Sequence, residues 1–227
     1  NEMIYVGSLR ADFELYTLLT TAEPVLTEVW LDKPKVAMIA WKDNGRLNIN
    51  ELIEAIGDLA TGSDTSTASP RSVFHVDKVH LTNGTYSYFD QRETNMAGFD
   101  YYHFTLDSIS AEVDQLRIAG DTFEINVQAL RCVDVKTKLR AHEMDVFYRY
   151  TSQNMQFEHL KAHIGKSFVA NYLEFQYDST DDLSDFNEKV TLKAHLDSSR
   201  FHTDDLAFFA PTLNGLNETY TIWTDLS

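Results

Sequence analysis

An irregular apolar repeat constrains this chain more than any other feature of its sequence. From residue 74 the apolar side chains step by two, three and two positions, at Phe74, Val76, Val79 and Leu81. A β-strand with one solvated face steps by two throughout. A step of three returns the side chains to the same face only where one extra residue is inserted, which is a β-bulge.

The same step of three recurs in five further segments that otherwise alternate with period two. These steps are Val6 to Leu9, Leu106 to Ile109, Val127 to Leu130, Ala141 to Met144, and Phe157 to Leu160. We interpret them as a weak internal repeat of single long strands. Chance matching is the alternative, because 43% of the residues are apolar. Bulges at similar places in neighbouring strands would bend a sheet into a trough with one apolar face.

Turn residues predict how the strands are connected. Asn83-Gly84 is typical of a tight hairpin, with Tyr86 and Tyr88 on the return strand. Residues 25–31 and 36–41 are predicted to form a second hairpin around residues 32–34. Later strands are expected to begin at Tyr102, Thr122, Lys136, Met155 and Ser167. Their short, polar connections favour an antiparallel meander.

Helical patterns are few. Residues 48–60 carry one apolar stripe, and Asn48 with Glu51 resembles a capping box, so we expect a short helix that plugs an open end of the sheet. A helical turn is expected within residues 178–188, and a short capped helix within residues 203–211. The predicted fold class is therefore all-β: an elongated, bent antiparallel sheet, a groove or half-pipe, with bulged long strands and one or two short helices.

The predicted domain organisation is a single segment, residues 1–227, of a longer chain. Possible sub-units 1–60 and 71–227 would be joined by a polar, flexible loop at residues 61–70. The first residue is Asn1 and the last eight look like an unfinished strand, so we expect an internal piece. No apolar run is long enough to span a bilayer and no signal peptide is visible.

Net charge excludes some classes of partner. The chain has 35 acidic and 19 basic residues, a formal net charge of −16. Nucleic-acid binding needs a basic surface, so we expect no nucleic-acid partner. Bulk attraction to anionic lipid headgroups is also disfavoured. Neither argument excludes acyl chains held in an apolar groove.

The sequence contains no motif that specifies an enzyme, a metal site or a cofactor. His159 and His163 lie four apart on a predicted strand, about 13 Å, too far for one metal ion. The acidic residues 178–185 lack the glycine and spacing of an EF-hand. Cys132 is the single cysteine, so it cannot form an internal disulfide and is expected to be a buried structural thiol.

Several segments resemble a known family. The stretch Asp43-Asn-Gly-Arg-Leu-Asn-Ile-Asn-Glu-Leu-Ile, followed by a polar loop and then residues 74–90, resembles the AsmA-like family. Leu173-Glu-Phe-Gln-Tyr-Asp-Ser and Asp205-Leu-Ala-Phe-Phe-Ala-Pro-Thr-Leu are similar to the N-terminal part of TamB-type members. The resemblance extends from about Ile4 to Trp223. Its motifs mark strands, turns and a helix, and none is catalytic.

The resemblance implies a cell-envelope protein of double-membrane bacteria, anchored in the inner membrane, of which this chain is a periplasmic segment. It implies a role in outer-membrane biogenesis, with phospholipid carried in a β-groove for transport between the membranes. The alternative is a scaffold that assists outer-membrane protein assembly, by docking strands at its sheet edges or through regions outside this segment.

Acyl chains in such a groove would gain roughly 0.8 kcal/mol per buried methylene. The residues predicted to line its inward face are Phe74, Val76, Val79, Phe104, Leu106, Ile109, Phe157, Leu160, Val169, Leu173 and Phe175. The alternative is that these side chains simply pack against one another or against a covering helix.

Overall fold

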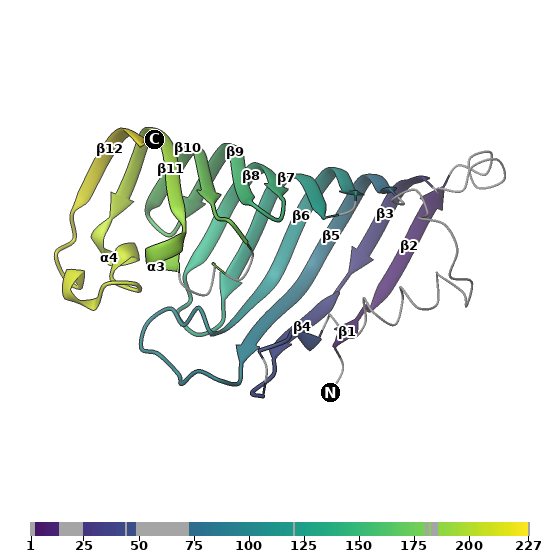
Figure 1. Cartoon of the computed structure of the whole chain (residues 1–227), viewed down its shortest axis with the longest axis horizontal. Helices are drawn as coiled ribbons and strands as arrows, with labels where there is room; N and C mark the ends of the chain where they lie inside the picture. Colours follow the sequence, from purple (N-terminus) through teal and green to yellow (C-terminus); the bar gives the residue numbers. More distant parts are fainter. Residues whose placement is uncertain are drawn as a thin grey trace.

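The chain forms one open, bent sheet of twelve strands (Figure 1). The computed structural model describes residues 3–13, 25–43, 45–48, 73–119, 121–179, 182 and 186–226. The all-β fold class and the bent, bulged half-pipe are confirmed. Residues 25–40 and 73–90, on either side of the predicted loop 61–70, belong to the same sheet.

Long strands make up most of the described residues. The strands are β1 (Ile4–Tyr5), β2 (Ser8–Phe13), β3 (Val25–Asp32), β4 (Lys35–Ala40), β5 (Val73–Asp90), β6 (His103–Ala119), β7 (Thr122–Asp134), β8 (Arg140–Tyr150), β9 (Asn154–Ile164), β10 (Ser167–Gln176), β11 (Thr191–His202) and β12 (Thr219–Leu226). From β5 to β12 each strand pairs antiparallel with the next, so the predicted meander is confirmed there.

The sheet is mixed at its other end, so the hairpin predicted around residues 32–34 is wrong. In the described structure β3 and β4 both run parallel to β5, β3 along its first half and β4 along its second. Lys33 interrupts this line with a positive φ of 51°. The break stays bound to β5, because the Lys33 amide donates to Thr82 O and the Thr85 amide donates to Pro34 O, both at 2.8 Å.

The hairpin predicted at Asn83-Gly84 is also wrong, because β5 continues through it as one strand of 18 residues. Asn83 does adopt a positive φ, 55°, as its side chain allows. However, the chain does not reverse: Leu81 pairs with Ala111 and Tyr86 with Leu106, with register shifts between them. The same left-handed conformation serves a turn or a bulge, and the long partner strand β6 selects the bulge.

The bulges predicted from the steps of three are confirmed in the later strands. Ser108 in β6, Ala129 in β7 and His159 in β9 have φ values of 54°, 51° and 54°. Register shifts occur beside each of them, and another lies between Ala141 and Glu143 in β8. Ser198 in β11, with φ 54°, adds one more. The bulges lie side by side in neighbouring strands, so they form a row that runs perpendicular to the strands.

Side chains satisfy backbone groups that the bulges release from the ladder. Asp145 Oδ1 accepts a hydrogen bond from the Ala129 amide at 2.8 Å. The Ser199 hydroxyl accepts from the Ala170 amide at 3.0 Å and donates to Ala170 O at 2.6 Å. These two bulges are therefore held by specific polar contacts, as buried backbone groups require.

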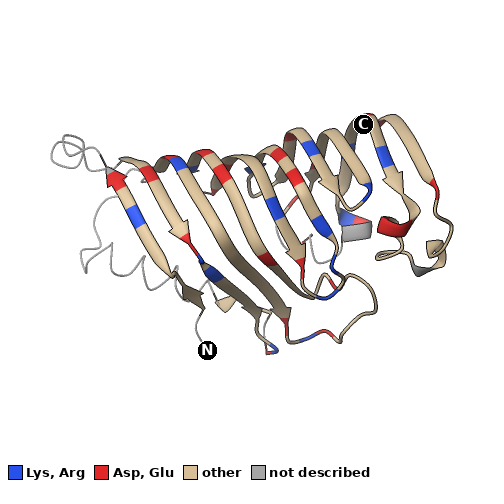
Figure 2. Cartoon of the chain, turned by 180° about the vertical axis from the view of Figure 1, so that it is seen from behind, with Lys and Arg blue, Asp and Glu red and all other residues tan. Residues whose placement is uncertain are grey.

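One face of the sheet, here called the inner face, carries the core. Its first cluster is Val29, Val76, Val79 and Val113, and its second is Val146, Leu160 and Ala162. Val127 packs against both clusters and joins them. Because Val76 and Val79 are buried together, the step of three keeps both on this face. Figure 2 views the sheet from behind and shows charged residues spread over its strands.

Helices are short in the described structure. They are α3 (Phe186–Lys189), α4 (Thr203–Leu206) and the 3-10 turn η2 (Pro211–Leu213). The helix predicted over residues 48–60 and the loop 61–70 lie outside the described residues from residue 49 onward. Asn48 is described, and its side chain bonds to β4, at the Ile39 amide and at Ala37 O. No described helix is long and apolar enough to cross a bilayer.

The strand predicted from Lys136 begins instead at Arg140, because residues 135–139 form a turn. Lys138 has a positive φ of 64° in that turn. The Asp134 carboxylate accepts from the amide and the hydroxyl of Thr137 at 2.7 and 2.6 Å. A local side-chain bond of this kind favours a turn over a continued strand.

We expect Asn83→Val to lower the free energy of unfolding by about 1–2 kcal/mol, because a β-branched residue disfavours positive φ. Asn83→Gly is the matched control, since it also removes the Asn83–Asp32 hydrogen bond but tolerates the conformation. Urea unfolding of both variants measures the difference. Equal stability would contradict a strained bulge at this position.

Candidate functional site

A row of aromatic rings crosses the inner face over four neighbouring strands. Ring centroids lie 6.1 Å apart for Phe123 and Tyr148, 5.0 Å for Tyr148 and Phe157, and 6.0 Å for Phe157 and Phe175. All four side chains are only half-buried. Burial raises the pKa of the Tyr148 hydroxyl. The row is therefore an uncharged apolar surface that solvent or a ligand can reach.

A second aromatic group lies where β5 and β6 meet. Phe104 contacts Tyr86, Tyr88 and Phe99, at centroid distances of 5.8, 5.9 and 5.7 Å. Burial raises the pKa of both tyrosine hydroxyls, so they stay neutral at physiological pH. Phe99 continues the contacts to Phe209, 5.4 Å away, in the segment after α4.

The structure brings the predicted groove residues onto the inner face but not into one pocket. Val76, Val79 and Leu160 are fully buried core residues. The half-buried ones are Phe104, Leu106, Ile109, Phe157, Val169, Leu173 and Phe175. The side chain of Phe74 lies outside the described set. The core residues fill the bottom of the trough, and the half-buried ones form its accessible lining.

Sequence reasoning missed how one side of the trough, along the ends of β6 to β11, is closed. The connection of residues 91–102 reaches the segment after α4, where the Phe99 amide donates to Phe208 O at 3.0 Å (Figure 1). Beneath this contact lies an apolar pocket of about 280 Å³. Its lining is Phe99, Leu106, Cys132, Asp134, Leu139, Ala141, Ile164, Ser167, Val169, Phe201, Asp205, Leu206 and Phe209. Only Leu106 and Val169 of the predicted residues belong to it.

Cys132 lies in this lining and is half-buried, rather than fully buried as the sequence predicts. Burial raises the pKa of its thiol above the ordinary value. The thiol is therefore protonated at neutral pH and is a poor nucleophile. The pocket offers apolar surface rather than covalent chemistry at this residue.

Two glycines allow the closing segments to approach. Gly98 has φ +76°, and a Cβ there would lie 2.3 Å from Phe208 O. Gly165 has φ +58°, and a Cβ there would lie 2.1 Å from Asp205 Oδ1. Asp205 in turn accepts from the Lys166 amide at 2.8 Å and from the Ser167 hydroxyl at 2.6 Å. These contacts hold α4 against the β9–β10 turn.

Buried carboxylates shape the connection of residues 91–102. Asp100 accepts hydrogen bonds from the amides of Met96, Tyr102 and His103 at 2.9, 3.2 and 3.1 Å. Burial would raise the pKa of Asp100, but these bonds and His103 outweigh it and hold the pKa below its ordinary value. The side-chain hydrogen bonds of Arg92 likewise lower the pKa of Asp90.

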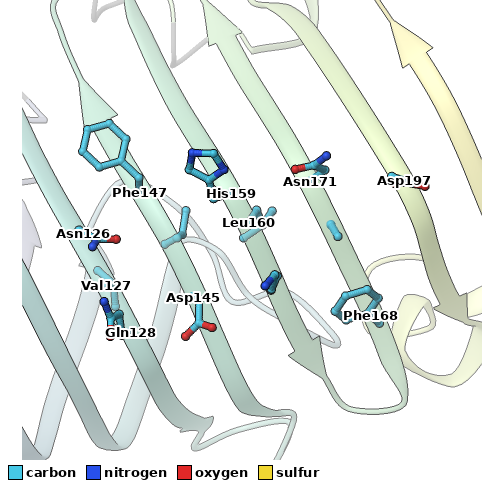
Figure 3. A pocket seen from close by; sticks show the side chains of 13 residues that line it. Asn126, Val127, Gln128, Asp145, Phe147, His159, Leu160, Phe168, Asn171 and Asp197 are labelled. Carbon is cyan, nitrogen blue, oxygen red and sulfur yellow. The ribbon is translucent and has the colours of Figure 1, made fainter.

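The outer face has one large hollow, of about 580 Å³, over β7 to β11 (Figure 3). Its lining mixes apolar residues, such as Phe147 and Phe168, with polar ones, among them Asn126, Asp145 and Asn171. Asp145 is already engaged with the Ala129 bulge. Within the residues that the structure describes, no group of three or more His, Cys, Asp or Glu side chains could hold a metal ion. The hollow therefore offers less as a site than the inner face.

Comparison with protein-family models, with curated proteins and with solved structures finds no match to this chain.

We expect Gly98→Ala to open the closed side of the trough, because the new Cβ meets Phe208 O and left-handed backbone costs a side chain about 1–2 kcal/mol. Hydrogen exchange at the Phe99 amide should accelerate. Gly215→Ala is the control: Gly215 has φ +85°, yet nothing lies within 4 Å of a Cβ there. An equal effect of the two substitutions on Phe99 exchange would show that the contact is unimportant.

Low pH should destabilise the connection of residues 91–102, which closes the trough. The folded-state pKa values of Asp90 and Asp100 are lowered, so their stabilisation is complete above the ordinary value of 3.8 and is lost as pH falls through the folded values below it. Thermal unfolding between pH 6 and pH 2.5 measures this loss. Asp100→Asn should unfold about 2 kcal/mol more easily at pH 6, since a buried acceptor is replaced, and should show a weaker acid dependence.

Proposed function

We propose that this chain is a trough that shelters the acyl chains of phospholipid. The observation that carries the proposal is the half-buried aromatic row Phe123, Tyr148, Phe157 and Phe175, which lies beside the buried second cluster. A core residue normally loses nearly all contact with water, whereas these half-buried rings keep part of theirs. Exposed apolar patches of this kind mark sites where a ligand or partner binds.

The dimensions of the trough suit extended acyl chains rather than compact ligands. Eight antiparallel strands from β5 to β12, spaced about 4.8 Å apart, extend over roughly 34 Å. Each methylene that leaves water in the trough contributes about 0.8 kcal/mol. Few hydrogen-bonding groups interrupt the aromatic row, so binding depends on chain length more than on chain identity. A headgroup could stay in water at the open side.

The resemblance of residues 43–53 and 74–90 to the AsmA-like family supports the same proposal. On this basis the chain is a periplasmic segment of an inner-membrane-anchored envelope protein in outer-membrane biogenesis. Its cargo is phospholipid in transit between the two membranes. It is not an enzyme and needs no cofactor.

A second candidate function is a scaffold for outer-membrane protein assembly. It is favoured by β12, which pairs with β11 alone in the described structure and has seven of its eight residues exposed. Such an edge can accept a further strand through its backbone groups. Binding of an outer-membrane protein strand without any bound lipid would favour this candidate.

The first test of the lipid proposal is organic extraction and mass spectrometry of the purified chain. We expect near-stoichiometric phospholipid. Phe157→Asp, on the aromatic row, should remove most of it, because a carboxylate then lies among the acyl chains. Phe147→Asp is the matched control, since Phe147 is also half-buried but lines the hollow on the outer face.

Circular dichroism must show that both variants remain folded. Lipid retained by folded Phe157→Asp, or a well-folded wild-type chain free of lipid, would contradict the groove. A lipid-free chain would favour the scaffold instead.

A further inference from the structure

The hollow on the outer face holds two side-chain amides without a partner. Asn126 and Asn171 are half-buried in its lining, and neither side chain makes a hydrogen bond to any described residue. Each amide offers two N–H donors and one carbonyl acceptor. Water satisfies such groups in the free protein, and a ligand with hydroxyl groups can replace that water, because a hydroxyl both donates and accepts.

Aromatic rings lie beside both amides. Phe147 lies opposite Asn126 in the β7–β8 register, and Phe168 precedes Asn171 on β10 (Figure 3). Both rings are half-buried. The ring of His163 holds Phe168 in place at a centroid distance of 4.8 Å. Apolar ring surface next to free amides suits a ligand that carries C–H and O–H groups side by side.

The row of bulges forms the floor of the hollow. His159, a bulge residue with φ 54°, belongs to the lining, and Gln128 and Asp197 each directly precede a bulge residue. Bulges redirect side chains and are common next to functional sites. Asp145 fixes one of them by accepting from the Ala129 amide at 2.8 Å. The lining therefore stands on backbone that is held in shape before any ligand arrives.

Charge and size narrow the class of ligand. The lining contains two carboxylates, of Asp145 and Asp197, and one ammonium group, of Lys161, which lies opposite Asp145 in the β8–β9 register. Such a mixture favours a neutral ligand over an anion. A cavity of about 150 Å³ accommodates benzene, so the volume of about 580 Å³ suits roughly 20 to 25 heavy atoms. Two linked sugar rings have this size.

We propose that the outer-face hollow binds a neutral disaccharide, either free or as one unit of a longer glycan. The C–H faces of the sugar rings lie against Phe147 and Phe168, and the hydroxyl groups exchange hydrogen bonds with Asn126 and Asn171. This goes beyond the proposed phospholipid trough and does not depend on it, because the acyl chains lie on the inner face of the sheet.

Calorimetric titration of the purified chain with maltose, cellobiose and N,N′-diacetylchitobiose tests the proposal. We expect saturable 1:1 binding of at least one of these disaccharides. Glycerol, which has hydroxyl groups but no ring, should not saturate the chain at the same concentrations. Failure of all three disaccharides to show saturable binding, or equal binding of glycerol, would overturn the proposal.

Substitution of one amide tests the location. Asn171→Leu keeps a similar side-chain size but removes the donors and the acceptor, so it should weaken disaccharide binding at least about tenfold. Thr221→Leu is the control, since Thr221 is exposed on β12 and lies outside the lining. Unchanged affinity in Asn171→Leu that circular dichroism shows to be folded would overturn the assignment.

Nuclear magnetic resonance of the labelled chain gives a second measure of location. The side-chain amide signals of Asn126 and Asn171 should shift when the disaccharide is added. The signal of Gln153, which lies outside the hollow, should not. Shifts that leave both asparagine side chains unaffected would place the ligand elsewhere.

The two proposals can fail separately. Phe157→Asp should lose phospholipid but bind the disaccharide as the wild type does, and Phe147→Asp should show the reverse. Loss of disaccharide binding from folded Phe157→Asp would contradict an independent site on the outer face. If phospholipid is absent while the disaccharide binds as expected, the trough proposal fails and the outer-face site stands.

Discussion

Inserted residues in most of the long strands keep the apolar side chains of this sheet on a single face. Without the left-handed residues Ser108, Ala129 and His159, every apolar side chain beyond them would point to the outer face, since strands alternate with period two. The two core clusters, the aromatic row and the apolar pocket at the closed side all depend on that correction. Asp145 and Ser199 support it by bonding to the backbone groups that the bulges release.

The repeat of irregular steps predicted the bulges of the later strands, because periodicity directly records which face each residue occupies. It could not distinguish a bulge from a turn at Asn83, since both conformations are left-handed and local chemistry is the same. Lys33-Pro34 led to the wrong prediction of a hairpin for a related reason, because the same turn residues occur where a strand is interrupted and where the chain reverses direction. The parallel pairing of β3 and β4 with β5 is a contact between distant segments, which local patterns do not encode.

The candidate site likewise has one part that local periodicity predicts and another part that depends on contacts between distant segments. The inward-facing residues follow from alternation, and the described ones lie where that pattern places them. The apolar pocket at the closed side depends on two loops far apart in sequence, which meet at Gly98 and Phe208. Of these two residues, only Gly98 could have indicated the contact from the sequence, and a single glycine has many possible structural explanations.

Because the bulges lie side by side in successive strands, the crease they create runs along the sheet rather than across it. The width and curvature of the trough are then fixed within each strand, whereas its length is fixed by the number of strands. A further strand with its bulge in the same place could pair with β12 and leave the cross-section unchanged. The length of such a trough can therefore change, by adding or removing strands, without a change in its width or curvature.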